Sequence, residues 1–184
     1  MENSYIANER LLNLIENLLD ISRIEAGRLE FDLEPIDLAK SAQAMVDDFQ
    51  QKAKAKGLKL QFYEQEKAPK VTADAKKISE VISNIIDNAV KYTPAGGKIR
   101  ISGSRDNRSM SIKIDNSAPH LKKGEMSYLS EPFYRSRDVL ETDIRGKGLG
   151  LYIARYIVES HKGEMLLHLS DDHIFSVTIS LPVQ

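Results

Sequence analysis

The sequence has 184 residues with 26 basic and 27 acidic side chains, a formal net charge of −1, and no cysteine. Hydrophobic residues make up 41% of the chain and charged residues 29%, which is typical of a globular protein with one substantial core. The balanced charge gives no electrostatic reason to expect nucleic acid as a partner, and the absence of cysteine excludes disulfides and thiol chemistry. No apolar run approaches the roughly 18 residues of a membrane-spanning helix. We therefore expect a cytoplasmic location and no membrane contact by this chain.

The first segment has the spacing of a helix from residue 6 to about residue 26. Its apolar residues fall in two rows, Leu11, Leu14, Leu18 and Ile21 beside Leu12, Ile15, Leu19 and Ile24. This stripe is wider than a two-stranded seam needs, so the helix is expected to pack against several neighbours. Gly27 is a candidate stop, and Pro35 marks an extended connection after it. We place a module boundary here, between residues 1–31 and 32–184.

The second module alternates helical and strand patterns. Helices are expected over 36–56, over 73–92 and in "GLGLYIARYIVESHKG", which begins at residue 148 and for which Gly163 is the expected stop. Strands are expected over 58–64, 70–74, 98–105, 109–116, 164–170 and 174–181, and a polar loop of about 30 residues precedes the last helix. This order predicts an α/β fold, a two-layer sandwich of a mixed, mostly antiparallel sheet and a helical layer, preceded by one long N-terminal helix.

Polar residues recur along one side of the predicted helix 73–92. Glu80, Asn84, Asn88 and Lys91 follow one another at spacings of four, four and three, opposite the apolar side. Such a row is often no more than a solvated face. Two asparagines on one face of a helix are unfavourable enough to suggest a function, because an amide oxygen can bind Mg²⁺ and a neighbouring lysine can bind phosphate.

Glycines at 146, 148 and 150 in "RGKGLGL" lead directly into the last helix. Glycines alone also make hinges, and this spacing fits neither the Walker loop nor the dinucleotide fingerprint. Their position before a helix start favours phosphate binding, because the backbone can come close and the first N–H groups are free. Arg145 and Lys147 add positive charge.

The stretch "EPFYR", residues 131–135, lies inside the long loop. Its two aromatic residues could fix the loop to the core, or they could belong to a lid that closes over a ligand. The residues alone leave both possibilities open.

Taken together, "EVISNIIDNAVKYTPAGG", "EPFYR" and "GKGLGLYIARYIVESHKG" resemble the N, F and G2 boxes of sensor histidine kinases. The first segment, "LLNLIENLLDISRIEAGRLE", is similar to the second helix of the dimerisation and phosphotransfer hairpin of these kinases. The resemblance covers almost the whole chain. It implies a GHKL-type ATP-binding catalytic domain over 32–184, in a transferase of two-component signal transduction that hands the γ-phosphoryl group of Mg-ATP to a histidine for the phosphorelay.

The resemblance also implies a role for each site residue. Asn88 would bind Mg²⁺ between the ATP phosphates with Asn84 in support, Lys91 would approach the phosphates, and Tyr92 would flank the base. Phe133 would belong to the lid. The loop and helix start would wrap the phosphates through Gly146, Lys147, Gly148, Leu149 and Gly150.

Two features depart from the family pattern. The adenine-binding box usually reads Asp-x-Gly-x-Gly, whereas "NSAPHL" places Asn116, Ala118 and His120 at those positions. An Asn oxygen can still accept a hydrogen bond from the adenine amine. The family's acceptor histidine, which is followed by an acidic residue, has no counterpart, because the four histidines here precede Leu121, Lys162, Leu169 and Ile174. The chain therefore looks like a fragment that can donate phosphate but cannot accept it.

The resemblance implies further partners: a cognate response regulator and a second copy of the chain, bound through the N-terminal helix. The fragment could be the cytoplasmic part of a membrane-bound sensor. Two alternatives stay open. One is another GHKL enzyme, such as a gyrase-like ATPase or a serine kinase, although these usually carry a Glu where Asn84 stands, and an amide cannot act as their general base. The other is a non-catalytic module that binds nucleotide or a partner protein.

Overall fold

The computed structural model describes Ile15, Leu19 and residues 21–24, 26–64, 69–136 and 146–183. The chain forms two units, Met1–Phe31 and Asp32–Gln184. In the first unit Ile15, Leu19 and 21–24 are helical, and the rest of the predicted helix 6–26 lies outside the described residues. Gly27 has a φ of 63° and Arg28 N–H donates to Arg23 O, so the predicted glycine stop is confirmed.

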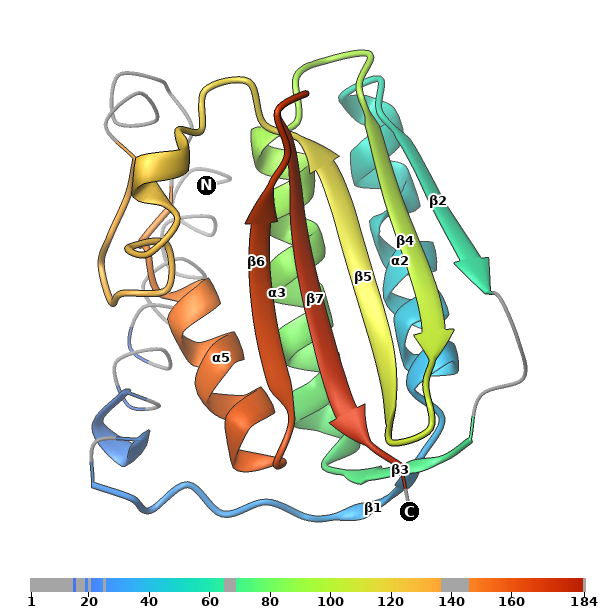
Figure 1. The fold of residues 1–184 in the computed structure, drawn as a ribbon, viewed down its shortest axis with the longest axis vertical. Helices are drawn as coiled ribbons and strands as arrows, with labels where there is room; N and C mark the ends of the chain where they lie inside the picture. Colours follow the sequence, from blue (N-terminus) through green and yellow to red (C-terminus); the bar gives the residue numbers. More distant parts are fainter. Residues whose placement is uncertain are drawn as a thin grey trace, which may run out of the picture. The chain divides into compact units, whose positions relative to one another are not determined.

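The second unit is built on a five-stranded sheet in the order β2-β4-β5-β7-β6 (Figure 1). The strands are β2 (Lys59–Glu64), β4 (Lys98–Arg105), β5 (Ser109–Ser117), β6 (Glu164–Leu169) and β7 (Ile174–Pro182). β2 runs parallel to β4, and the other neighbours are antiparallel. The predicted mixed, mostly antiparallel sheet is confirmed, including the hairpin of β4 and β5.

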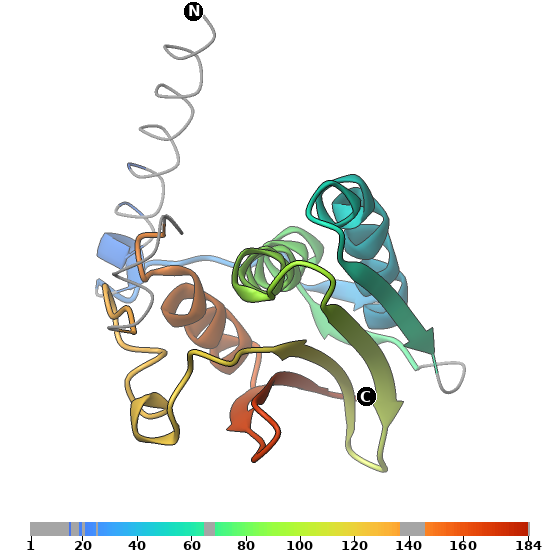
Figure 2. The same ribbon diagram turned by 90° about the horizontal axis from the view of Figure 1, so that it is seen from above.

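Three helices cover one face of this sheet (Figure 2). They are α2 (Leu38–Ala55), α3 (Ala75–Tyr92) and α5 (Gly150–Ser160), and α3 lies between the other two and contacts both. β4 and β5 alternate buried and more exposed residues, as expected for strands covered on one side only. Large side chains fill the layer between sheet and helices, among them Ile82, Ile85, Ile101, Ile112, Ile153 and Ile179. The predicted two-layer sandwich is therefore confirmed.

A second, two-stranded sheet was not predicted as such. β1 (Glu34–Ile36) pairs antiparallel with β3 (Val71–Ala73), so the extended connection around Pro35 forms a strand. Pro35 lacks an N–H donor, which suits a short two-stranded ribbon better than a central strand. β3 leads directly into α3 through Asp74, whose carboxylate accepts hydrogen bonds from the N–H groups of Lys76 and Lys77.

The predicted stop of the last helix at Gly163 is wrong in its residue. α5 ends at Ser160, and the left-handed residue after it is Lys162, with a φ of 58°. Gly163 serves packing instead, because a Cβ at this position would lie 2.4 Å from the carbonyl oxygen of Ser180 in β7. A glycine after a helix can therefore mark a close approach to the next strand and not the helix stop itself.

Candidate functional site

α3 places its predicted polar residues on one side and its core residues on the other. The buried side consists of Ile78, Val81, Ile82, Ile85, Ile86, Ala89 and Val90. Asn84, Asn88 and Lys91 are partly exposed on the opposite side. Glu80 shares that side but forms an ion pair with Lys77 at 2.9 Å, which fits a solvated face. The two amides are thus the unusual feature of this helix.

The two amides face the start of α5. A Cβ built on Gly150, the first residue of α5, would lie 3.8 Å from Cβ and Cγ of Asn84 and 3.8 Å from Nδ2 of Asn88. Leu149, the residue before it, is fully buried and anchors the helix start in the core. The first N–H groups of a helix have no partners within the helix and attract anions. Amide side chains and an anion-binding helix start therefore meet at one place.

The glycine loop before α5 lies against Tyr92 and the loop that holds Phe133. A Cβ on Gly146 would lie 3.3 Å from the Tyr92 hydroxyl. Gly148 has a φ of 71°, and a Cβ there would lie 2.5 Å from Tyr134 O and 2.7 Å from the carbonyl carbon of Phe133. Phe133 N–H donates to Gly148 O at 2.9 Å. Only glycine fits at position 148, because both the backbone angle and the contact exclude a side chain.

The aromatic pair of "EPFYR" divides into two different environments. Tyr134 packs, since its ring stacks on Tyr128 at 5.6 Å and its hydroxyl donates to Glu125 at 3.2 Å. Phe133 is 61% exposed and has a φ of 64°, an uncommon conformation for an aromatic residue. Tyr134 fits the prediction of a residue that fixes the loop, and exposed Phe133 fits that of a lid residue.

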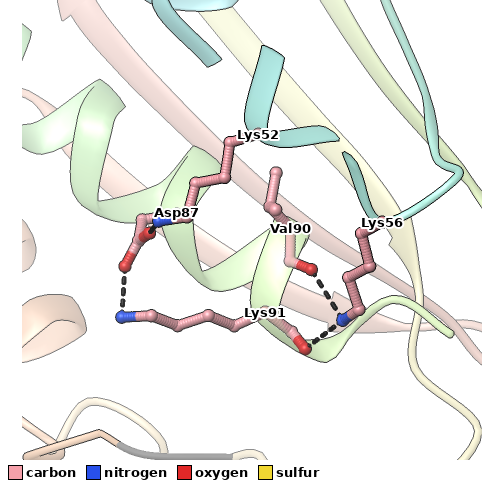
Figure 3. Close-up of polar contacts among 5 residues, drawn as sticks. All are labelled: Lys52, Lys56, Asp87, Val90 and Lys91. Carbon is pink, nitrogen blue, oxygen red and sulfur yellow. Dashed lines mark hydrogen bonds and ion pairs between the residues drawn. The ribbon is translucent and has the colours of Figure 1, made fainter. Parts of the chain in front are cut away.

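Positive charges gather near the C-terminal end of α3 (Figure 3). The Lys91 ammonium forms an ion pair with Asp87, which also accepts from Lys52 of α2. Burial alone would raise the pKa of Asp87, but hydrogen bonds from Lys52 and Lys91 bring it below its ordinary value. Burial lowers the pKa of Lys147, and the positive charge of Lys91 lowers it further. The two predicted phosphate-binding lysines, Lys91 and Lys147, therefore act on each other through their charges.

Tyr92 lies at the end of α3 beside Arg135. Burial raises the pKa of its hydroxyl above the ordinary value, and the hydrogen bond and charge of Arg135 oppose this shift. Thr93 follows Tyr92 in the sequence, and Ser136 follows Arg135. The hydroxyl oxygens of Thr93 and Ser136 are buried and have no hydrogen-bond partner in the described part of the chain.

Asn116 lies at the end of β5, where it is buried and donates from Nδ2 to Ser117 O at 3.0 Å. Its side-chain oxygen is the atom that could accept from an adenine amine. The described non-glycine residues with positive φ are Phe133, Lys162 and His173, so Ala118 and His120 replace the family glycines without backbone strain. Ala118 is also buried and its N–H donates to His173 O.

Four residues of this region were missed in the sequence. Asp87 and Lys91 are four apart on a helix, a spacing that predicts an ion pair, but the pair was overlooked beside the asparagines. Lys52 comes from another helix, and Lys56 donates to the carbonyl oxygens of Val90 and Lys91 at 2.9 and 2.6 Å. Arg135 reaches Tyr92 from the loop. No local pattern predicts these three contacts. Arg145 lies outside the described residues.

Residues 73–184 match the family described as "Histidine kinase-, DNA gyrase B-, and HSP90-like ATPase". The chain belongs to this ATPase family. Membership implies ATP binding, and the resemblance seen in the three sequence boxes is confirmed. The match covers α3, the glycine loop and α5, which are the elements that form the site.

A curated relative agrees with this assignment. The signal transduction histidine-protein kinase BaeS of Escherichia coli (strain K12) is 29% identical over 174 residues, which are 95% of this chain and 37% of that protein. The chain spans less than half the length of the curated relatives it matches. Among the described residues, no helix combines the length and the apolar character that crossing a membrane requires.

Two solved structures share the fold. Full-length ShkA in complex with AMPPNP superposes with a TM-score of 0.84 at 20% identity, over 98% of this chain and 38% of that chain. Histidine kinase ThkA in complex with the response regulator protein TrrA gives a TM-score of 0.74 at 21% identity, over 98% of this chain and 50% of that chain. These likenesses confirm the fold of the GHKL-type catalytic domain.

The residues present fit a magnesium ion held together with a nucleotide. In the described ranges no group of three or more His, Cys, Asp and Glu side chains could hold a metal. Mg²⁺ does not need such a group beside a triphosphate, since it keeps several waters and takes one or two protein oxygens together with phosphate oxygens. Gly150 leaves the space in front of Asn84 and Asn88 free of a side chain. This donor set suits Mg²⁺ bound with ATP better than a metal bound by protein alone.

Proposed function

We propose that this chain is the ATP-binding catalytic domain of a sensor histidine kinase, which transfers the γ-phosphoryl group of ATP to a histidine in two-component signal transduction. The observation that carries this choice is the pair of amides, Asn84 and Asn88, facing Gly150. A gyrase-like ATPase or a serine kinase of the family would need a carboxylate as general base at position 84. The nearby carboxylates, Glu80 and Asp87, are ion-paired with lysines.

Each site residue has a defined role in this proposal. Asn88 holds Mg²⁺ through its side-chain oxygen, and Asn84 supports the same site. Bound there, Mg²⁺ would supply positive charge to the phosphates. Lys91 and Lys147 bind phosphate oxygens, while the N–H groups of Gly146, Gly148 and Gly150 receive the phosphates at the start of α5. Leu149 anchors this start in the core.

The base and the lid involve other elements. Tyr92 flanks the adenine, and Asn116 accepts from its amine through the side-chain oxygen. Phe133 belongs to the lid, a role supported by its exposure and by the contact of its backbone with Gly148. In this loop Phe133 contacts the glycine loop, and Arg135 contacts Tyr92. Closure of the lid can therefore affect the phosphate side and the base side of the site together.

The test of donor function uses labelled ATP with Mg²⁺. The chain alone is expected to gain no phosphohistidine, because none of its four histidines precedes an acidic residue. Mixed with a helical hairpin that carries such a histidine from its parent kinase, it should phosphorylate that histidine slowly, since tethering is absent. ATP binding without any transfer would favour a non-catalytic nucleotide-binding module, for which the altered "NSAPHL" box is the supporting feature.

The first unit has a role of its own in this proposal. We assign 1–31 to the second helix of the dimerisation hairpin and 32–184 to the catalytic domain. Ile15 and Leu19, four residues apart, are 46% and 51% exposed and offer an apolar row to a second copy. Sedimentation should show a weak dimer that dissociates when residues 1–30 are deleted. A strict monomer at high concentration would contradict this assignment.

A response regulator is the further partner that we propose, in the cytoplasm. The structure of ThkA is titled as a complex with such a protein. A pull-down with the regulator encoded beside the parent gene would test the partnership.

A further inference from the structure

Asp87 lies on α3 between Asn84 and Asn88, four residues before Lys91. Its carboxylate contacts the Lys91 ammonium, one helical turn further on, and the Lys52 ammonium of α2 (Figure 3). Its side chain is 23% exposed, less than that of either lysine. Lys52, Asp87 and Lys91 thus form a chain of three alternating charges that joins α2 to the polar face of α3.

An acidic partner restricts where a lysine ammonium lies. A free lysine side chain samples many rotamers, and ordering it on ligand binding costs conformational entropy. Lys91 also feels the positive charge of Lys147, which pushes the two ammonium groups apart. The carboxylate of Asp87 opposes both effects, because it restricts the Lys91 ammonium and offsets the repulsion.

We propose that Asp87 is a positioning residue for Lys91, which holds the ammonium toward the nucleotide phosphates, and that Lys52 fixes Asp87 from α2. This inference rests on the proposed function, since it takes Lys91 as a phosphate ligand. The residue itself touches no reacting atom.

If Asp87 positions Lys91, its removal should weaken ATP binding. If Asp87 instead competes with phosphate for the Lys91 ammonium, its removal should strengthen ATP binding. An ammonium has three donors, so Lys91 can keep its bond to Asp87 and still donate to a phosphate oxygen. Asp87 shares its negative charge with Lys52, so Lys91 is not fully neutralised by the pair. Both facts favour positioning over competition between Asp87 and phosphate for the same ammonium.

The experiment measures dissociation constants for ATP with Mg²⁺ by calorimetry, and for adenosine by displacement, on the full chain. Asp87→Asn should weaken ATP binding about fivefold, the upper range for a partly exposed ion pair, and Lys52→Met should weaken it less. Adenosine binding should not change, because it has no phosphates. In a Lys91→Met background, Asp87→Asn should have no further effect on ATP.

The matched control is Asp171→Asn, which removes another Asp–Lys ion pair, with Lys123, at an exposed turn. This control should leave ATP binding unchanged. Tighter ATP binding by Asp87→Asn would overturn the inference in favour of competition, and an undiminished effect in the Lys91→Met background would show that Asp87 acts elsewhere. If the unmodified chain binds no ATP, the proposed function itself fails. If Lys91→Met weakens ATP binding but Asp87→Asn leaves it unchanged, only the role of Asp87 fails.

Discussion

The two ends of α3 use polar residues in different ways. At the N-terminal end Asp74 is buried, caps the helix, and accepts a further bond from Asp32 N–H. His161 is also buried; its Nε2 accepts from Asp74 N–H, so Nδ1 carries the proton and donates to Ile157 O at 2.6 Å. At the C-terminal end Lys91 and Tyr92 are only partly buried, among cations from other elements.

This difference separates an end of α3 that stabilises the fold from the end that we propose to bind the nucleotide. At the N-terminal end the buried polar groups use their hydrogen bonds on one another, so they stabilise the fold. At the C-terminal end the cations outnumber the one carboxylate, Asp87, that pairs with Lys52 and Lys91, and such a positive excess at a partly exposed place attracts anions. The dipole of α3 itself disfavours an anion at its C-terminal end. Our proposal therefore assigns phosphate binding to lysine side chains and to the N-terminus of α5. The predictions below test this division.

The largest effect is expected at Asn88. Asn88→Ala should weaken Mg-ATP binding about 100-fold, because a metal ligand beside the triphosphate is lost. The melting temperature without nucleotide should not change, since the residue lies outside the core face of α3. Calorimetry and thermal unfolding measure the two quantities. Asn107→Ala, in the exposed turn between β4 and β5, is the matched control, and an equal loss there or retained affinity in Asn88→Ala would refute the metal role.

The opposite pattern is expected at Asp74. Asp74→Ala should lower the free energy of unfolding by about 2 kcal/mol, the upper range for a helix cap, because several backbone N–H groups lose their acceptor. ATP affinity of the folded protein should stay the same. Urea unfolding and calorimetry at the same temperature provide the comparison. A loss of ATP affinity comparable to that of Asn88→Ala would mean that the two ends are coupled.

The pH dependence of this stabilisation has a definite sign. Burial raises the pKa of Asp74, but hydrogen bonds from the N–H groups of Lys77, Asp32 and Lys76 lower it more, so its folded pKa lies below the ordinary value. A lowered carboxyl pKa means that the stabilisation is fully present above the unfolded pKa of about 3.9 and is lost as pH falls through the folded pKa. The stability difference between the unmodified chain and Asp74→Ala should therefore shrink below about pH 4.

A third substitution should separate stability from binding at one residue. Gly150→Ala adds a methyl group 3.8 Å from both amides, where it fits sterically but occupies the space before them. Alanine favours the helix over glycine by about 0.5–1 kcal/mol, so stability should rise slightly, while ATP affinity should fall about tenfold. Gly124→Ala, where a Cβ would meet nothing within 4 Å, is the control. Unchanged ATP affinity in Gly150→Ala would place the phosphates elsewhere.

The sequence predicted the elements of the second unit because their patterns are local. The apolar row from Ile78 to Val90 defines α3, and alternation defines β4 and β5. The strand β1 could not be predicted with its partner, because its pairing with β3 depends on chain segments more than 30 residues apart. The error at Gly163 has the same origin, since the strand that Gly163 contacts lies elsewhere in the chain.

In the candidate site, too, the features within one element were predictable and the contacts between separate elements were not. Asn84 and Asn88 were recognised because they lie on one helix, and the structure adds that both face Gly150. The Lys52–Asp87 pair and the Arg135–Tyr92 contact join separate elements, so spacing carries no signal for them. The roles of the individual residues in binding ATP and metal stay predictions until the substitutions above are measured.

The smallest effect is expected at Lys56, a cation at the C-terminal end of α3 that we assign to structure. Its ammonium donates to the carbonyl oxygens of Val90 and Lys91, which lack partners within the helix. Lys56→Met should lower the free energy of unfolding by about 0.5–1 kcal/mol, since a cation at a helix end contributes about this much. Burial lowers the pKa of Lys56, so desolvation offsets part of the gain and keeps the effect small.

Measurements of ATP binding test whether Lys56 is structural while Lys91 binds phosphate. Lys56→Met should leave the dissociation constant for ATP within about twofold, whereas Lys91→Met should raise it clearly. Two of the three donors of the Lys56 ammonium are bonded to backbone oxygens, whereas Lys91 keeps donors beside its ion pair with Asp87. Lys54→Met, an exposed lysine in the last turn of α2 two residues before Lys56, is the control for the loss of one positive charge. If Lys56→Met weakens ATP binding more than Lys54→Met does at equal ionic strength, the cap also belongs to the anion site, and the C-terminal end of α3 is functional throughout.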